Sequence, residues 1–307
     1  MLKMYHSGEA EGGSADFWEK AWSDGAFEEA LRFCDVDPLG PLLRRHAGPR
    51  SRVLEGGCGR GQYVAYYSAR GAQVVGLDFA RDALAELRRR RPGLMLCAGD
   101  VGRLPFREGS FDVYYSGGVV EHFEAGPEPA LHEARRVLRD EGVLLVSVPY
   151  LSPVRRILSI VRRRDRRRVS TPRVDEGSGR GSFYQYAFTR REFETILAAC
   201  GFRTRSVQGY AILWGLSEVP GVSALVGLAV RTRTPAPAAP GGPVSPPTLS
   251  PEPSAAPSAT SLLKRLVVSE DDRVPFLGRA VRLLRWACAN MIMFECVPES
   301  PTAPARE

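Results

Sequence analysis

The sequence predicts an α/β protein built on a doubly wound, seven-stranded, mostly parallel sheet with helices on both faces. From residue 51 onward, short apolar or β-branched runs alternate with stretches of helical character. This alternation is typical of parallel strands that are joined by helical crossovers. The composition agrees, because 44% hydrophobic and 25% charged residues over 307 positions are typical of a globular protein with a sizeable buried core.

Seven runs are expected to form the strands of this sheet. The first five are residues 52–55, 73–78, 94–98, 111–116 and 143–149. The sixth and seventh are residues 202–213 and 290–297. Because the first five fall within about a hundred residues, their spacing is that of a doubly wound sheet.

Three helices are expected between the early strands, over residues 63–69, 81–91 and 128–139. Gly142 lies near the C′ position of the third helix, where glycine is favoured. The second helix ends in four arginines, 88–91. They suit the negative end of the helix dipole, so they do not by themselves indicate nucleic-acid binding.

A fourth helix, over residues 189–201, carries the most complete local signals. Thr189 is expected to be its N-cap, and Glu192 three residues later completes a capping box. Phe188 and Phe193 occupy the two positions of a hydrophobic staple, and Gly201 is expected to end the helix.

The chain is expected to divide into five parts. They are an N-terminal helical lid at 1–45, an α/β core at 46–213 that is expected to carry the chemistry and holds a basic insertion at 150–182, an apolar segment at 214–233, a tether at 234–260 and a C-terminal segment at 261–307 that holds the last strand, 290–297. The tether is predicted to be disordered, because nine prolines among Ala, Ser, Gly and Thr leave too little apolar surface to bury.

The formal net charge of +7 has one source. Residues 155–168 hold eight arginines and one acid, Asp165, so the rest of the chain is formally neutral. Apolar residues at 154, 157, 158 and 161 give this segment an amphipathic helical pattern. Three interpretations stay open: the segment roofs the active site, lies on an anionic membrane surface or contacts RNA.

The six cysteines show neither a C-x-x-C pair nor the Cys/His spacing of a zinc site, so we expect no disulfide and no metal. The N-terminal residues lack the pattern of a secretory signal. Glu218 and Pro220 interrupt the apolar stretch at 211–230, which argues against a membrane span. These features predict a cytoplasmic protein, and peripheral contact with the inner membrane surface through residues 154–168 is a further hypothesis.

The sharpest ligand signal follows the first strand, where residues 55–61 read Glu-Gly-Gly-Cys-Gly-Arg-Gly. The glycines allow a tight turn and let backbone N–H groups approach a ligand at a helix N-terminus. A dinucleotide fingerprint that starts at Gly57 needs Gly or Ala at position 62, and Gln62 breaks it. Glu55 is unfavourable beside a pyrophosphate, but it suits the ammonium group of a ligand that contains an amino acid.

Two more acids lie where a nucleoside would need them. Asp78 ends the second strand, where a carboxylate can accept hydrogen bonds from both hydroxyls of a ribose. Asp100 follows the third strand, beside Val101, and could accept from an adenine amino group. Residues 116–118, Ser-Gly-Gly, place small side chains where the reacting end of the ligand would lie. Taken alone, each acid could equally be a turn or capping residue.

Motifs in residues 50–150 resemble, in the correct order, those of class I S-adenosylmethionine-dependent methyltransferases of the type 11 group. They are Glu55-x-Gly57-x-Gly59-x-Gly61, Asp78, Gly99-Asp100-Val101, Leu104-Pro105-Phe106, the run 111–116 and Glu121-His122-Phe123. The resemblance extends weakly to residues 189–201 and leaves 1–45 and 214–289 unexplained. It implies a Rossmann-like class I methyltransferase fold, with S-adenosyl-L-methionine as the cofactor.

The resemblance also implies a set of cofactor-binding residues. They are Glu55, Gly57, Cys58, Gly59, Gly61, Asp78, Phe79, Asp100, Val101, Ser116, Gly117 and Gly118. The loop glycines would pass under the methionine part, Asp78 would hold the ribose and Asp100 the adenine. The backbone of residues 116–118 would face the sulfonium.

Methyl transfer needs two reactants held in line and water excluded, so no nucleophilic side chain is required. If the acceptor is a hydroxyl or an acidic C–H, His122 is the best-placed base, although a packing role explains this histidine equally well. The sequence after the fourth strand lacks the D/N-P-P-Y/F/W loop that is usual for nucleobase amines in this superfamily.

The sequence therefore predicts methyl transfer to a small-molecule or lipid-linked acceptor. An RNA methyltransferase that uses the basic insertion is the first alternative, and a non-catalytic interaction protein with this fold is the second. The identity of the acceptor, the atom that is methylated and the oligomeric state are not determined by the sequence.

Overall fold

The computed structural model describes residues 1–6, 27–166, 182–222, 270, 272–273 and 277–299. Its centre is a seven-stranded sheet in the order β4-β3-β2-β5-β6-β9-β8. The strands are β2 (Arg52–Gly56), β3 (Gln73–Asp78), β4 (Met95–Ala98), β5 (Phe111–Gly117), β6 (Leu138–Pro149), β8 (Phe202–Tyr210) and β9 (Met291–Pro298). β9 is antiparallel to both of its neighbours, and the other pairs are parallel. The predicted fold class is confirmed.

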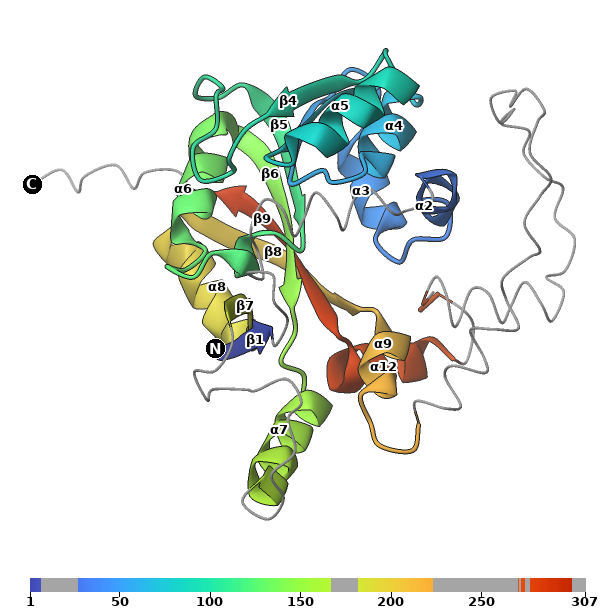
Figure 1. Cartoon of the computed structure of the whole chain (residues 1–307), viewed down its shortest axis with the longest axis vertical. Helices are drawn as coiled ribbons and strands as arrows, with labels where there is room; N and C mark the ends of the chain where they lie inside the picture. Colours follow the sequence, from blue (N-terminus) through green and yellow to red (C-terminus); the bar gives the residue numbers. More distant parts are fainter. Residues whose placement is uncertain (7–26, 167–181, 223–269, 271, 274–276, 300–307) are drawn as a thin grey trace, which may run out of the picture.

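Helices cover both faces of the sheet, as Figure 1 shows. They are α6 (Glu128–Val137) and α8 (Arg190–Ala199) on one face, and α3 (Gly40–His46), α4 (Gln62–Ser68) and α5 (Arg81–Arg90) on the other. Leu54 of β2 is buried with the first pair and its neighbour Val53 with the second group. Successive side chains of a strand point to opposite faces, so β2 contributes to both layers of the core.

The signals predicted around residue 189 are confirmed. Thr189 accepts a hydrogen bond from the backbone N–H of Glu192 at 3.3 Å, and the Glu192 carboxylate accepts from the Thr189 N–H at 2.9 Å. The rings of Phe188 and Phe193 lie 5.0 Å apart and are fully buried. Gly201 follows the helix with a φ of 79°, in the left-handed region that favours glycine.

The junction between α6 and β6 differs from the prediction. The helix ends at Val137 and the strand begins directly at Leu138, so Gly142 lies within β6 and not after a longer helix. Leu138 is buried and pairs with Phe111, and the register of β5 and β6 shifts after that pair. Burial of Leu138 at the sheet therefore outweighs the local preference of residues 138–139 for helix.

The sixth strand is shorter than predicted. β8 ends at Tyr210, and residues 212–213 belong to helix α9 (Ile212–Ser217). Ala211 has a φ of 62°, a left-handed conformation that ends extended pairing. The chain turns away from the sheet at this residue.

The N-terminal residues are not wholly helical, in contrast to the predicted lid. Strand β1 (Leu2–His6) pairs antiparallel with β7 (Ser182–Ala187) in a separate two-stranded sheet. Its backbone groups are satisfied by pairing with residues that are distant in the sequence, which local propensity does not reveal. Helix α2 (Phe27–Phe33) precedes α3. Residues 7–26 of the predicted lid and the predicted tether 234–260 lie outside the described residues.

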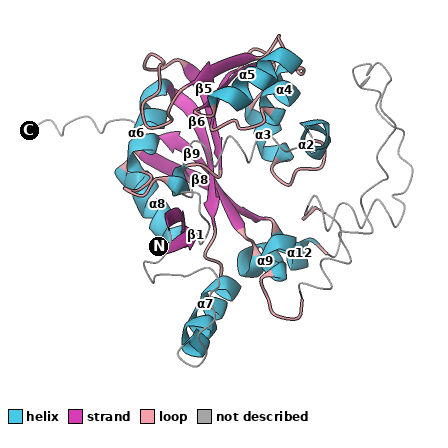
Figure 2. Cartoon of the chain, in the orientation of Figure 1, coloured by secondary structure: helices cyan, strands magenta, loops and turns pink. Residues whose placement is uncertain are grey.

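Three helices gather beyond one end of the sheet, in the lower part of Figure 2. They are α7 (Pro153–Arg166), α9 and α12 (Gly278–Cys288). Among the described residues, none of the helices is long and apolar enough to cross a membrane.

Candidate functional site

A cavity of about 530 Å³ opens at the carboxyl ends of β2, β3 and β5. Ligands bind at this edge in open α/β sheets. The cavity brings together most of the residues singled out in the sequence: Glu55, Gly57, Cys58, Gly59, Asp78, Phe79, Asp100, Val101, Gly117, Gly118 and His122. Gly61 and Ser116 do not line it. Gly61 is the N-cap of α4, and Ser116 is buried behind the wall.

The glycine-rich loop bonds to β3 through its backbone. The N–H groups of Gly57 and Cys58 donate to Leu77 O at 2.8 and 3.0 Å, and the N–H of Gly59 donates to Asp78 Oδ2 at 2.7 Å. The expectation that these N–H groups approach a ligand is therefore wrong for these three residues. Their donors instead fix the loop against the neighbouring strand.

Gly57 contributes space at the cavity. It has a φ of 77°, and a Cβ at this residue would lie 2.3 Å from Val119 Cγ2. A larger residue would be strained and would press on a side chain that lines the cavity. The glycine therefore allows the loop to lie close to the turn that follows β5.

Asp78 has a structural role in addition to its place in the cavity wall. Its carboxylate accepts from the Gly59 N–H through one oxygen and from the Ala80 N–H through the other, at 2.7 and 3.0 Å. The side chain is buried, with 4% exposed. Since each carboxylate oxygen accepts more than one hydrogen bond, a ligand hydroxyl can share these atoms with the backbone.

Glu55 is buried at the base of the cavity, and its Oε2 has no hydrogen-bond partner among the described residues. Burial, together with the nearby Asp78, raises the pKa of the Glu55 carboxyl well above its usual range. A buried acceptor without a donor is costly. The atom is thus suited to a cationic or hydrogen-bond-donating group of a ligand.

Asp100 lies at the outer rim of the cavity. Its Oδ1 accepts from the Gly102 N–H at 2.8 Å, in the manner of an Asx turn. Asp100 thus forms a turn of the kind weighed in the sequence analysis, and it also lines the cavity. Val101 beside it is buried and supplies an apolar part of the lining.

His122 lies in the short 3-10 turn η1 (Val120–His122) that follows β5, and it lines the cavity. Its Nδ1 is 2.7 Å from Tyr184 O. A carbonyl only accepts, so Nδ1 carries the proton and Nε2 carries the lone pair. Burial lowers the pKa of His122 to about 4. The imidazole is therefore neutral at neutral pH.

Glu121 lies next to this histidine and is 2% exposed. Its Oε1 is 4.0 Å from His122 Nε2, and its Oε2 has no partner among the described residues. Burial raises the pKa of Glu121 to about 8. The side chain is therefore mostly protonated at neutral pH.

Several cavity residues were not among the predicted cofactor-binding or catalytic residues. They are Arg60, Gln62, Tyr63, Gly99, Tyr115, Val119, Phe123 and Glu124. Most are adjacent in the sequence to a predicted site residue, so the spacing of the motif could have indicated them. Tyr63 is different, because its position depends on a hydrogen bond from its hydroxyl to the buried Asp37 at 2.7 Å and on ring contact with Tyr115.

The described residues contain no group of three or more His, Cys, Asp or Glu side chains that could hold a metal ion. The cavity is lined by two buried acids, Glu55 and Asp78, by His122 and by apolar and aromatic side chains.

Residues 54–146 match the protein family described as "Methyltransferase domain". Demethylmenaquinone methyltransferase of Beutenbergia cavernae is 43% identical over 119 residues, which are 38% of this chain and 45% of that protein. Malonyl-[acyl-carrier protein] O-methyltransferase of Erwinia pyrifoliae is 34% identical over 136 residues, which are 44% of this chain and 50% of that protein. The match thus spans about half the length of these curated relatives.

Solved structures share the fold over most of the chain. The complex that contains the Haloferax volcanii Trm112 methyltransferase activator gives a TM-score of 0.52 at 16% identity, and covers 92% of this chain and 98% of that one. A methyltransferase structure from Galdieria sulphuraria gives 0.51 at 12% identity, with 93% and 98% covered. At these identities the likeness concerns the fold alone.

Proposed function

We propose that this chain, whose residues 54–146 form a class I S-adenosylmethionine-dependent methyltransferase domain of the type 11 group, transfers a methyl group to a small-molecule or lipid-linked acceptor. S-adenosyl-L-methionine is the cofactor of this family. The observation that carries the proposal is the cavity at the carboxyl ends of β2, β3 and β5. There Glu55, whose Oε2 has no partner among the described residues, meets two further carboxylates and a glycine-lined wall.

The residues present fit this cofactor. The unpartnered Oε2 of Glu55 matches the ammonium group of a methionine moiety, and Gly57 leaves room that a Cβ would fill. Asp78 would hold the ribose and Asp100 the adenine. The surrounding surface of the cofactor site would be formed by Cys58, Gly59, Phe79 and Val101. Gly117 and Gly118 would border the reacting end. When bound, S-adenosylmethionine supplies a methyl group on a sulfonium whose leaving group is neutral.

The protein's own contribution is to position the acceptor and exclude water. Proximity of this kind supplies on the order of 7–11 kcal/mol of a reaction barrier. We assign His122 the role of base for an acidic acceptor proton, because its Nε2 carries the lone pair at a histidine that lines the cavity. With a pKa of about 4, this imidazole is neutral at neutral pH and suits an acceptor that is itself acidic.

The acceptor class rests on the size and walls of the cavity. Tyr63, Tyr115, Val119 and Phe123 give it an apolar and aromatic lining, which suits an apolar or conjugated acceptor. The two curated relatives are named for a quinone precursor and for a carrier-linked acyl chain. The basic insertion gives little support to an RNA acceptor, because one of its arginines, Arg155, is buried in an ion pair with Glu218.

Calorimetry with S-adenosylhomocysteine tests the cofactor assignment. We expect the wild type to bind and Asp78→Ala to bind roughly tenfold to a hundredfold more weakly, the loss of one or two charged hydrogen bonds. Asp140→Ala, at an exposed residue far from the cavity lining, is the matched control. Because Asp78 also caps two backbone N–H groups, thermal melting must show that the variant is folded. Absence of binding by the wild type, or equal binding by folded Asp78→Ala, would overturn the proposal.

A further inference from the structure

The helices α7, α9 and α12 all lie at the edge of the sheet where the cavity opens. α7 follows the end of β6, α9 follows the end of β8 and α12 precedes the start of β9. The register places these three ends side by side, because Met291 pairs with both Pro149 and Tyr210. Met291 also approaches the cavity wall, since its Cε lies 3.7 Å from the place of a Cβ on Gly118.

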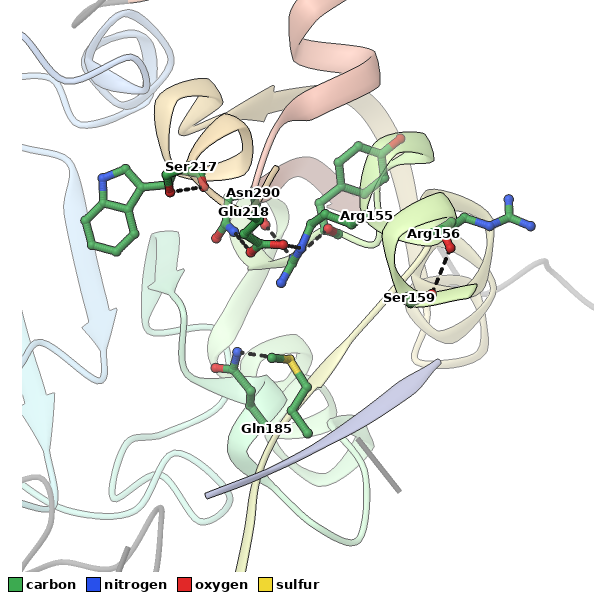
Figure 3. A network of polar contacts seen from close by, with 10 residues as sticks. Arg155, Arg156, Ser159, Gln185, Ser217, Glu218 and Asn290 are labelled. Atoms are coloured by element: carbon green, nitrogen blue, oxygen red, sulfur yellow. Dashed lines mark hydrogen bonds and ion pairs between the residues drawn. The ribbon is translucent and has the colours of Figure 1, made fainter. Parts of the chain in front are cut away.

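A buried polar cluster holds the three helices together (Figure 3). Arg155 of α7 donates from Nε to Glu218 Oε2 at 2.9 Å, and its guanidinium also donates to Tyr150 O at 2.8 Å and Asn290 O at 3.3 Å. The Asn290 amide donates to Glu218 Oε1 at 2.8 Å. Arg155 is thus an internal connector, and Figure 3 shows the neighbouring Arg156 pointing away from it.

Apolar contacts complete this assembly. Ile212, Val281 and Cys288 form a small buried cluster against which Val154 of α7 packs. α12 contacts both α7 and α9. The helices therefore form one supported surface next to the cavity.

Large apolar side chains on these helices nevertheless remain exposed. Trp214 of α9 is 74% exposed, and Leu283 and Trp286 of α12 are 61% and 60% exposed. At about 100° per residue, Leu283 and Trp286 lie opposite the buried Val281 and Cys288 of the same helix. The exposed side of α12 therefore carries two large apolar side chains beside the exposed Arg279 and Arg282.

The same feature occurs on α7, and we name the whole surface the apolar platform. It consists of Ile157, Ile160, Val161, Trp214, Leu283 and Trp286. Elsewhere in the described chain, the exposed large apolar side chains are few and scattered: Met1, Phe33, Phe79 and Met95. A gathered patch of this kind is typical of an interaction surface.

The helices of the platform carry an excess of positive charge. Arg156, Arg279 and Arg282 are exposed on α7 and α12, and of these Arg282 lies 3.5 Å from the carboxylate of Asp272, which precedes α12. Neither α9 nor α12 contains an acidic residue, and α7 contains one, Asp165, against six arginines. Tryptophan and leucine bordered by arginine match the boundary between acyl chains and anionic headgroups.

We propose that the apolar platform docks on an anionic lipid bilayer, so that the cavity lies next to the membrane and takes an acceptor that resides there. This step rests on the proposed function, whose acceptor it narrows to amphipathic or lipid-linked molecules. α7, α9 and α12 insert Ile157, Trp214 and Trp286 among the acyl chains while the arginines meet lipid phosphates. The junction at Asn290 and Met291 joins the docked helices to the cavity wall.

Co-sedimentation of the full chain with vesicles tests this proposal. The vesicles contain phosphatidylcholine alone or phosphatidylcholine mixed with phosphatidylglycerol. We expect binding to the mixed vesicles only, weakened by salt. Leu283→Ser together with Trp286→Ser should reduce partitioning at least tenfold, and Arg156→Gln with Arg279→Gln roughly tenfold. Phe33→Ser, an exposed apolar residue on α2, is the matched control and should bind like the wild type.

Calorimetry with S-adenosylhomocysteine on the same variants separates the two proposals. If the platform variants lose vesicle binding but retain the ligand, docking is supported; if no protein binds the ligand, the proposed function fails whatever the vesicle result. Equal pelleting of wild type and platform variants would overturn the docking proposal. The docking proposal would also be overturned if sedimentation velocity showed a dimer that dissociates in the platform variants while no protein binds vesicles. It would be overturned as well if the full chain bound RNA in preference to vesicles and the arginine substitutions abolished that RNA binding.

Discussion

Glu121 gives the sharpest test of the electrostatics beside the cavity. The carboxyl is 2% exposed, one of its oxygens lacks a partner among the described residues, and burial raises its pKa from 4.5 to about 8. The titratable groups that face it are His122, Tyr184 and Tyr210. Burial lowers the pKa of His122 and raises the pKa values of both tyrosines, so all three are neutral at neutral pH and provide no compensating positive charge.

The sign of the pH effect follows from the two pKa values. Below pH 4.5 Glu121 is protonated in both states, and the stability that it contributes is fully present. As the pH rises toward 8, the unfolded chain releases the proton while the folded protein retains it. Stability then falls by about 1.4 kcal/mol per pH unit. Between pH 4.5 and 7 the loss reaches about 3 kcal/mol, and it stops growing above the folded-state pKa.

Glu121→Gln should remove this pH dependence. We expect the free energy of unfolding of the variant, relative to wild type, to rise by about 3 kcal/mol between about pH 4 and pH 7. Urea unfolding followed by circular dichroism measures both proteins across this range. If the amide packs less well than the carboxyl, the resulting loss of stability is the same at every pH, so it does not change how the free energy of unfolding depends on pH. Glu141→Gln, at an exposed residue, is the control. Parallel curves for wild type and Glu121→Gln would refute the raised pKa.

Two further predictions concern the loop and the polar cluster. Gly57→Ala should destabilise the protein by about 1–3 kcal/mol in thermal melting, because the new Cβ would press on Val119. Adding Val119→Ala should restore part of this stability. If it restores none, the strain does not arise from the contact with Val119. Arg155→Met should cost about 2–3 kcal/mol in urea unfolding, because it removes the hydrogen bonds of the buried guanidinium to Glu218, Tyr150 O and Asn290 O. Arg156→Met, at an exposed residue, should cost little. Equal effects of the two substitutions would contradict a structural role of Arg155.

Much of the α/β core could be predicted from local patterns. Residues 73–78 were predicted as a strand and form β3 with the same bounds, because an apolar, β-branched run ends at a single acid. The helix after Thr189 was equally readable, since its capping box and staple involve residues within five positions of one another. Cavity residues such as Asp78 and Gly57 were found because they lie at strand ends: Asp78 is the last residue of β3, and Gly57 directly follows β2.

The parts that could not be predicted depend on contacts between distant residues. Leu138 continues β6 instead of α6 because it pairs with Phe111 in the core. Arg155 belongs to the most basic run of the chain, and only the fold places Glu218 next to it. The loop N–H groups were expected to face a ligand, yet the carbonyl of Leu77 on the adjacent strand accepts two of them.

The family match and the apolar platform divide the molecule into two functional halves. Residues 54–146 supply the walls of the cavity that we assign to the cofactor, and they end within β6. Every helix of the platform lies outside this match, in segments attached to the same sheet edge. If both proposals hold, cofactor binding and acceptor access are encoded in different parts of the chain. Substitutions on the platform should therefore change which acceptors reach the cavity while leaving the affinity for S-adenosylhomocysteine intact.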